Sequence, residues 1–259
     1  MEINICPNST ELGKEAGSKA ALIIRAAIAS KGAANIILAT GTSQLPTLQQ
    51  LVSERDIDWS KVVMFHLDEY IGLPVTARAS FRKYLKERFI EKLPSLKAAH
   101  LINGEADADN ECTRLGELIK IHPIDVALVG IGENGHLAFN DPPADFETEQ
   151  PYIIVQLDEA CRKQQLGEGW FETLEAVPTR AISMSIKQIM KSKAIICSVP
   201  DSRKAKAVKN TLEEKVSSVY PASILQLHPN CTMVLDEGAA MLLSERTKRD
   251  IHVKKSAGQ

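Results

Sequence analysis

Two kinds of apolar pattern alternate along this 259-residue chain. In the first, apolar side chains recur every three or four residues, as they do on one face of a helix. Residues 12–28 are the clearest case, with Ser9 or Thr10 as the expected N-cap and Gly32 as the expected end. The other helical segments are residues 44–54, 80–92, 109–121, 203–213 and 237–245. In the second pattern short runs are mostly apolar throughout: residues 35–39, 62–67, 124–129, 153–157, 194–199 and 231–235.

Continuous apolar runs are typical of strands that are covered on both faces. Such strands, alternating with amphipathic helices, predict a mostly parallel sheet flanked by helices in three layers. The chain has 44% apolar and 25% charged side chains, and we find no internal repeat and no linker. We therefore expect an α/β fold in which residues 1–259 form a single domain.

Charge and composition limit the partners. Lys and Arg number 31 against 33 Asp and Glu, and a net charge of -2 offers no attraction for DNA or RNA. We expect the basic tail, residues 246–255, to be a solvated end. The chain opens without a basic and apolar leader, and no apolar run approaches the ~20 residues that span a bilayer. Its five cysteines are scattered, as in a reducing compartment. These features predict a cytoplasmic protein that binds neither nucleic acid nor membrane.

Residues 130–135, GIGENG, match the G-x-G-x-x-G fingerprint of dinucleotide-binding folds. That fingerprint requires a strand before it and a long helix after it. A strand is predicted at 124–129, but Pro142 and Pro143 would end any helix within two turns. We therefore expect no dinucleotide here. The loop instead carries polar side chains at Glu133, Asn134, His136, Asn140 and Asp141.

Ligands of open α/β sheets bind beyond the carboxyl ends of the strands, and two of the loops expected there suit an anion. Residues 39–43, ATGTS, offer a glycine, hydroxyls and free backbone N–H groups at a helix start. A strand-to-helix turn also needs such residues for purely structural reasons. Residues 199–206 place Lys204 in a first helical turn, where its charge opposes the helix dipole. Lys204 either faces an anion or points to water.

The other two loops carry candidate acids and bases. Asp68 and Glu69 follow a buried strand, and because adjacent side chains point to opposite sides, one can face a ligand while the other caps or pairs. Both can also be solvated. His136 is either an acid/base or a structural histidine. A metal site could be built from His66, Asp68, His136 and Asp141. These residues include no tight ligand pair such as H-x-x-x-H, so we expect no metal site.

The four loops together resemble the glucosamine-6-phosphate deaminase family. The resemblance covers nearly the whole chain and rests on IILATGTSQLPTLQQL, VVMFHLDEYIGLP, VGIGENGHLAFNDP, SRKAKAVKNTL and PASILQLHPNCTMVLDE. It implies a modified Rossmann-like sandwich that needs no metal or organic cofactor. The implied reaction converts an amino-sugar 6-phosphate and water to a ketose 6-phosphate and ammonium.

The resemblance also implies roles for residues. Asp68 aligns with the base that moves a proton from C2 to C1 of the sugar, and His136 aligns with the histidine that opens the ring. The implied phosphate site is Gly41, Thr42, Ser43 and Lys204.

Four departures from the family pattern change these expectations. Asn134 and Asp141 stand where well-known members carry Asp and Glu, so the pair that orients and charges His136 is altered. Gln165 stands at the family's phosphate-binding arginine. Residues 144–153 lack the basic residues that bind an activator in regulated members, so activation is not expected. The possible stand-ins for the arginine are Arg162, Lys163 and Arg180.

Three alternatives stay open beside a glucosamine-6-phosphate deaminase. A galactosamine-6-phosphate deaminase/isomerase tolerates asparagine at the position of Asn134. A 6-phosphogluconolactonase shares the fold but differs around Asp68 and His136. A non-catalytic sugar-phosphate sensor would need a DNA-binding module, for which the chain has no room before its first core helix. The expected partner is a small amino-sugar phosphate, and self-association into a homo-oligomer is left open.

Overall fold

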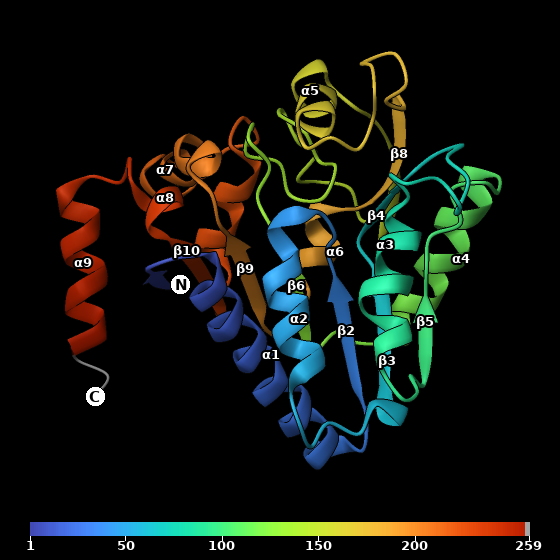
Figure 1. The fold of residues 1–259 in the computed structure, drawn as a ribbon, viewed down its shortest axis with the longest axis horizontal. Coiled ribbons are helices and arrows are strands. Elements are labelled where there is room, and N and C mark those ends of the chain that lie inside the picture. The colour runs from blue at the N-terminus through green and yellow to red at the C-terminus, as the bar shows by residue number, and fades with distance from the viewer. Residues whose placement is uncertain (257–259) are drawn as a thin grey trace.

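A computed structural model describes residues 1–256 of the chain, and side chains up to residue 251. In this part, seven parallel strands form the main sheet, in the order β1-β10-β9-β6-β2-β3-β5 (Figure 1). Their bounds are β1 Glu2–Cys6, β2 Ala34–Leu38, β3 Val62–His66, β5 Ala98–His100, β6 Val126–Val129, β9 Ile195–Val199 and β10 Cys231–Asp236. The predicted parallel sheet is confirmed, although the sequence pattern missed its two edge strands, β1 and β5.

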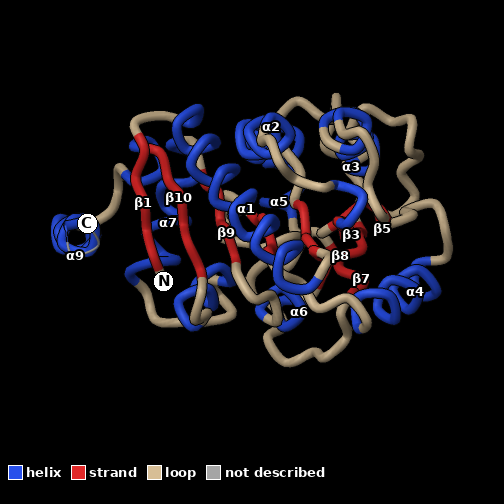
Figure 2. The backbone as a smooth tube through the Cα atoms, turned by 90° about the horizontal axis from the view of Figure 1, so that it is seen from below, coloured by secondary structure: helices blue, strands red, loops and turns tan. Residues whose placement is uncertain are grey.

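Helices cover both faces of this sheet (Figure 2). The alternation of the strands separates the two faces: Ile36 and Leu38 of β2 pack with α1 and α2, whereas Ile37 between them packs on the other side. On the first side lie α1 Ser9–Lys31, α2 Leu45–Ser53 and α3 Phe81–Arg88. On the other side lie α4 Ala108–Lys120, α6 Ile186–Met190, α7 Ala205–Glu213 and α8 Glu237–Ala240. The three-layer α/β fold is thereby confirmed.

A second, antiparallel sheet was not predicted. It has the order β4-β8-β7, with bounds β4 Asp68–Tyr70, β7 Tyr152–Gln156 and β8 Arg180–Met184. The prediction that residues 153–157 belong to the parallel sheet is wrong, because an apolar run does not say which sheet it joins. The predicted strand 62–67 ends at His66, and after Leu67 the chain enters β4. Asp68 therefore lies on a strand rather than in a loop.

Several helix boundaries also differ from the pattern. Helix α1 begins after Asn8, whose side chain accepts a hydrogen bond from the N–H of Glu11 at 3.0 Å, so neither Ser9 nor Thr10 is the cap. Its end at Gly32 in the left-handed conformation is confirmed. Segment 80–92 splits into α3 and a 3-10 turn, and segment 237–245 contains only the short α8. Helix α5, Glu159–Gly167, was missed.

The basic tail forms α9, Glu245–Ser256, at one end of the molecule (Figure 1), with Ile251 buried in the same apolar cluster as Ala239 and Ala240 of α8. Lys254 and Lys255, which are part of the tail predicted to be a solvated end, have side chains outside the described part. A search of the described residues finds no helix with the length and apolar character that a membrane span requires.

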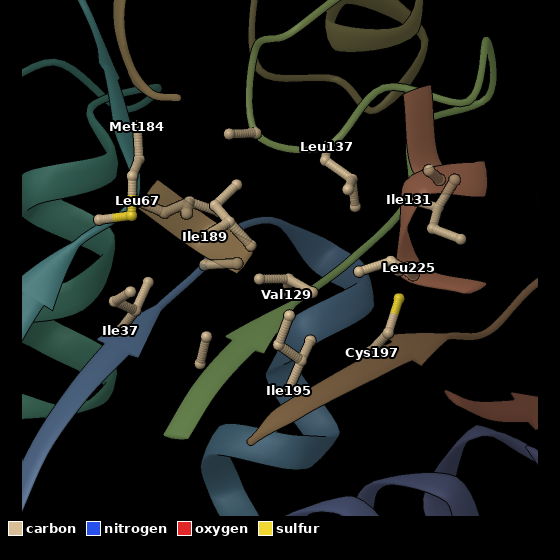
Figure 3. Close-up of a cluster of buried hydrophobic side chains, with 14 of the residues drawn as sticks. Ile37, Leu67, Val129, Ile131, Leu137, Met184, Ile189, Ile195, Cys197 and Leu225 are labelled. Atoms are coloured by element: carbon tan, nitrogen blue, oxygen red, sulfur yellow. The ribbon is translucent and has the colours of Figure 1, made fainter. Parts of the chain in front are cut away.

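The core continues from the main sheet up to the loops at its carboxyl edge (Figure 3). Ile37, Val129 and Ile195 of the sheet share one buried cluster with Ile131 and Leu137 of the 130–143 loop. Leu137 is 0% exposed. This apolar anchoring fixes the loop that carries His136.

Candidate active site

The loops predicted to carry chemistry meet in one cavity at the carboxyl ends of the parallel strands. In Figure 1 the arrows of β2 and β9 point towards the loops that lie beneath α5. Segments after β2, β3, β6 and β9, together with α5, supply the lining. The lining residues are Ala39, Thr40, Gly41, Ser43, Gln44, Leu67, Asp68, Phe81, Gly130, Ile131, Gly132, His136, Ala138, Phe139, Gln164, Gln165, Glu168 and Lys204.

The loop after β2 has the form of an anion-binding turn. Gly41 has φ of 95°, a conformation that costs glycine little, and it precedes the 3-10 turn that leads into α2. The Tyr84 hydroxyl of α3 donates to the Gly41 carbonyl at 2.9 Å, which holds the loop in place. Gly41 and Ser43 line the cavity, whereas Thr42 is exposed and is not part of the lining.

Lys204 lines the same cavity from the turn before α7. It is 3% exposed, and within the described residues no carboxylate lies at ion-pairing distance from its ammonium group. Burial lowers the pKa of Lys204, while Glu168 and Glu133 act in the opposite direction. A buried cation without a paired anion is costly unless a ligand supplies the opposite charge. The position therefore suits a phosphate group.

The adjacent carboxylates of β4 have different environments. Glu69 is 0% exposed and accepts hydrogen bonds from the N–H groups of Tyr70, Phe81 and Arg82 and from the Ser80 hydroxyl. Asp68 is 7% exposed and lines the cavity, and no side-chain hydrogen bond to its carboxylate is found in the described part of the chain. Burial, followed by the charge of Glu69, raises the pKa of Asp68 to about 8. The expectation that one carboxylate faces a ligand while the other caps a helix fits this geometry.

His136 is held by a network of acidic and amide groups. Its Nδ1 lies 2.9 Å from Asp141 Oδ1, and Asn134 Nδ2 donates to the same oxygen at 2.9 Å. The N–H of Asp158 donates to the other oxygen at 3.1 Å. Burial alone would raise the pKa of Asp141, but these hydrogen bonds lower it below its usual range. An ionised Asp141 therefore fixes the imidazole with its proton on Nδ1 and leaves Nε2 for a substrate.

Glycine at position 132 makes room for this histidine. A Cβ atom placed on Gly132 would lie 2.2 Å from His136 Nε2 and 2.3 Å from Cε1, so the ring packs directly on the backbone of the G-x-G turn. In the described part of the chain Asn134 has no hydrogen bond to the imidazole: its Oδ1 accepts from the backbone N–H of His136 at 3.1 Å, and its Nδ2 donates to Asp141. The amide thus orients Asp141 and the loop rather than the imidazole.

Helix α5 covers the cavity and carries both Gln165, at the position of the missing arginine, and Arg162, one of its possible stand-ins. Gln165 lines the cavity and its Oε1 accepts from the Tyr70 hydroxyl at 2.8 Å. Arg162 is not in the lining; its guanidinium donates to the backbone carbonyls of Leu174 and Val177. Of the two, only Gln165 is therefore positioned to contact a ligand in this cavity.

Sequence reasoning missed several residues around the cavity. Gln44 and Gln164 belong to the lining, and so does Glu168, whose carboxylate accepts from Gln164 and Trp170. Asp158 is the N-cap of α5, and its side chain accepts a hydrogen bond from the N–H of Cys161. An aspartate is a typical start signal of a helix, but it was overlooked because this helix was not predicted. His66 lies elsewhere: it is fully buried, and burial, with Arg82, lowers its pKa to about 3.

The expectation about metals needs one qualification. Among the described residues, one group of His, Cys, Asp and Glu side chains has ligand atoms close enough to share an ion, and it consists of His136, Asp141 and Cys161. Neither His66 nor Asp68 belongs to it. Cys161, one of the five scattered cysteines, therefore lies beside the candidate catalytic histidine.

The arrangement combines a cation, a general base and an acid/base pair in one enclosed space. Lys204 and the Gly41 loop can hold an anion, Asp68 can take a proton, and the His136–Asp141 pair can exchange one. This set suits proton transfers on a phosphorylated small molecule.

The chain is similar to known proteins over most of its length. Residues 7–234 match the family described as "Glucosamine-6-phosphate isomerases/6-phosphogluconolactonase". A glucosamine-6-phosphate deaminase of Bacillus cytotoxicus is 39% identical over 246 residues, which are 95% of this chain and 90% of that protein. One of Bacillus cereus is 37% identical over the same shares.

Solved structures agree with these matches. The structure of a monomeric glucosamine-6-phosphate deaminase has a TM-score of 0.86 at 32% identity and covers 93% of this chain and 100% of its own. A 6-phosphogluconolactonase from Trypanosoma brucei, with a TM-score of 0.75 at 18% identity over 94% of this chain and 98% of its own, shares the fold. With a family match over most of its length, this chain belongs to the glucosamine-6-phosphate isomerase/6-phosphogluconolactonase family.

Proposed function

We propose that this protein is a glucosamine-6-phosphate deaminase, which converts glucosamine 6-phosphate and water to fructose 6-phosphate and ammonium. The observation that carries the proposal is the pair of buried ionisable side chains, Asp68 and Lys204, which have no ion-pair partner among the described residues and line the cavity that also contains His136. The deaminase relatives, 37–39% identical over 95% of the chain, support the same reaction.

Substrate binding begins with the phosphate. Lys204 supplies the opposite charge, and the Gly41–Ser43 turn supplies backbone N–H groups at the start of a helix. Gln165 can add a neutral hydrogen bond at the position where related enzymes carry arginine. The resulting site has one fixed cation, so phosphate affinity depends strongly on Lys204.

Ring opening is assigned to His136. With Nδ1 bonded to Asp141 at 2.9 Å, Nε2 takes the proton of the C1 hydroxyl and returns a proton to the ring oxygen. The sugar is then an open-chain aldehyde with its amino group on C2.

The isomerisation is assigned to Asp68. Its raised pKa of about 8 makes it a stronger base than an ordinary aspartate, and a substrate ammonium group beside it favours the ionised form. Asp68 removes the C2 proton to give an enolamine and delivers that proton to C1. Water then adds to the ketimine at C2, and ammonia leaves as the ketose forms.

The decisive experiment is ammonium release from glucosamine, galactosamine and mannosamine 6-phosphates, with hydrolysis of 6-phosphogluconolactone measured alongside. We expect glucosamine 6-phosphate to turn over fastest without added metal. Lactone hydrolysis without ammonium release would overturn the proposal. Faster release from galactosamine 6-phosphate would instead favour the second candidate, a galactosamine-6-phosphate deaminase/isomerase, which Asn134 supports.

Two further expectations accompany the activity. We propose a cytoplasmic location, because the scattered cysteines suit a reducing compartment. Self-association into a homo-oligomer remains a proposal that light scattering coupled to gel filtration tests; the solved relative of highest TM-score reported above is described as monomeric.

A further inference from the structure

Cys161 occupies a position that neither packing nor the proposed chemistry requires of a thiol. It lies in α5, is 1% exposed, and its Sγ lies within 4.8 Å of a ligand atom of both His136 and Asp141, which are themselves 2.9 Å apart. All three side chains are at least nine-tenths buried. The three atoms thus converge on one point inside the protein.

Their chemistry matches one class of ion. A thiolate, an imidazole nitrogen and a carboxylate oxygen are the ligands of Zn²⁺, whereas Mg²⁺ and Ca²⁺ prefer oxygen alone. Zinc bonds of roughly 2.0–2.3 Å in a tetrahedron separate ligand atoms by roughly 3.3–3.8 Å. The 2.9 Å contact between His136 Nδ1 and Asp141 must therefore open by about 0.5 Å, and the Cys161 sulfur must approach by up to about 1 Å. Solvent can fill the fourth position.

An acidic groove leads to this point. Asp141 lines an open groove of about 740 Å³ in addition to its contact with His136. Among its described lining residues the groove has four aspartates, and no lysine or arginine. These aspartates are Asp109, Asp141, Asp145 and Asp158. A groove of this charge concentrates cations at its wall.

We propose that His136 Nδ1, an Asp141 oxygen and Cys161 Sγ form a reversible binding site for a thiophilic divalent cation, foremost Zn²⁺, and that its occupancy stops the enzyme. Binding displaces the proton of the Cys161 thiol, which leaves to solvent, and shifts the Nδ1 proton of neutral His136 to Nε2. Nε2 can then no longer accept the proton of the C1 hydroxyl. The inhibition rests on the proposed role of His136, whereas the binding does not.

Calorimetric titration of the full-length, freshly reduced protein with ZnCl₂ tests the binding independently of activity. Co²⁺, used as a spectroscopic substitute, should give a thiolate-to-metal charge-transfer band. We expect one ion per chain and release of at least one proton. A chain that takes up neither ion, or a Co²⁺ complex without the thiolate band, would overturn the proposal.

Two cysteine variants locate the site. Cys161→Ala should weaken Zn²⁺ binding by about 100-fold or more, since even changes next to metal ligands typically cost 10- to 100-fold. Cys161→Ser serves as the conservative variant, and thermal unfolding shows whether each is folded. Cys112→Ala removes a thiol that lines the same groove but lies outside the cluster, and it should leave Zn²⁺ affinity unchanged. Loss of binding in Cys112→Ala, with retention in folded Cys161→Ala, would refute the assignment.

Ammonium release then tests the inhibition. Zn²⁺ should inhibit the parent protein and Cys112→Ala at the concentrations that bind, and Mg²⁺ should have no effect. Cys161→Ala should keep its turnover at those Zn²⁺ concentrations. Full turnover of the zinc-loaded parent would contradict the inhibitory role, and a parent that binds Zn²⁺ but never releases ammonium would contradict the proposed function instead.

Discussion

Asp68 and Glu69 are neighbours in sequence, equally acidic and both buried, yet they have opposite relations to the protein around them. Glu69 accepts four hydrogen bonds, three of them from backbone N–H groups, and lies 3.4 Å from the Arg82 guanidinium. Asp68 faces the cavity, and its pKa is raised to about 8. One carboxylate stabilises the start of α3, and the other is held ready for a proton.

The difference lies in the number of donors rather than in burial. Hydrogen bonds from backbone amides compensate part of the hydration that Glu69 loses, although burial still raises its pKa. Without such donors, burial of Asp68 is unfavourable and makes sense where the group has a chemical task. Buried charge alone therefore does not indicate function, whereas buried charge without partners does.

Asp68→Asn gives the largest expected effect. We expect the rate of ammonium release to fall by roughly 10²- to 10⁴-fold, because a positioned base is lost while size and shape are kept. Exchange of the C2 hydrogen with deuterated solvent should stop as well, and binding of the phosphate group should persist. A variant that still exchanges this hydrogen at the parent rate would remove Asp68 from the mechanism.

The same variant should become more stable than the parent as pH rises. Asp68 has an ordinary pKa of 3.8 and about 8 in the fold, so between these values the folded protein keeps a proton that the unfolded chain has released. The contribution of Asp68 to stability is complete below pH ~4 and decreases progressively as the pH rises to ~8. Over this range the free energy of unfolding falls by at most about 1.4 kcal/mol per pH unit.

Urea unfolding at several pH values measures this difference. The stability of Asp68→Asn relative to the parent should increase from pH 5 to pH 8 and level off above pH 9. A pH-independent difference would mean that Asp68 titrates normally in the fold.

Glu69→Gln should affect folding more than activity, which is the reverse of what we expect for Asp68→Asn. A glutamine keeps one acceptor oxygen but turns an NH₂ group towards the N–H donors, so we expect a loss of about 1–3 kcal/mol in the free energy of unfolding. Removing the charge of Glu69 also removes a cause of the raised pKa of Asp68. The acid limb of the kcat/KM profile, along which activity rises as Asp68 ionises, should therefore move to lower pH, which a purely structural defect would not produce.

The sequence predicts features of this comparison that depend on neighbouring residues, but not those that depend on residues far apart in the chain. The alternation of side chains in a strand already separated Asp68 from Glu69, because it is a local rule. Apolar runs likewise predicted the parallel sheet and the loops that meet at its edge. The donors of Glu69 were not predictable in the same way, since Phe81 and Arg82 approach it only after α3 folds back onto β4.

Helix α5 is the clearest case in which the sequence did not predict the positions of site residues. Its nine residues, EACRKQQLG, have few apolar side chains, so no helix was predicted there and the positions of Arg162, Gln165 and Cys161 could not be predicted either. The resemblance placed Gln165 at the family's phosphate-binding arginine and left Arg162, Lys163 and Arg180 as possible stand-ins. Only the fold shows that the Arg162 guanidinium is engaged by the carbonyls of Leu174 and Val177.

Asn134→Asp has the smallest expected effect. It tests whether Asp141, a carboxylate with several hydrogen bonds, behaves more like Asp68 when one of its donors is removed. Asn134 Nδ2 donates to Asp141 at 2.9 Å and to Asp158 at 3.3 Å, so the substitution replaces a donor by a third acid. The pKa of Asp141 should rise, while the added negative charge stabilises the charged form of His136. These effects oppose each other in ring opening, and we expect a change in kcat of less than about 10-fold, with the optimum moved to higher pH. The measurement is the pH profile of ammonium release beside Asn134→Ala, which removes the donor without adding charge. Equal profiles for the two variants would show that charge at position 134 is irrelevant, and that the asparagine acts only by holding Asp141 in place.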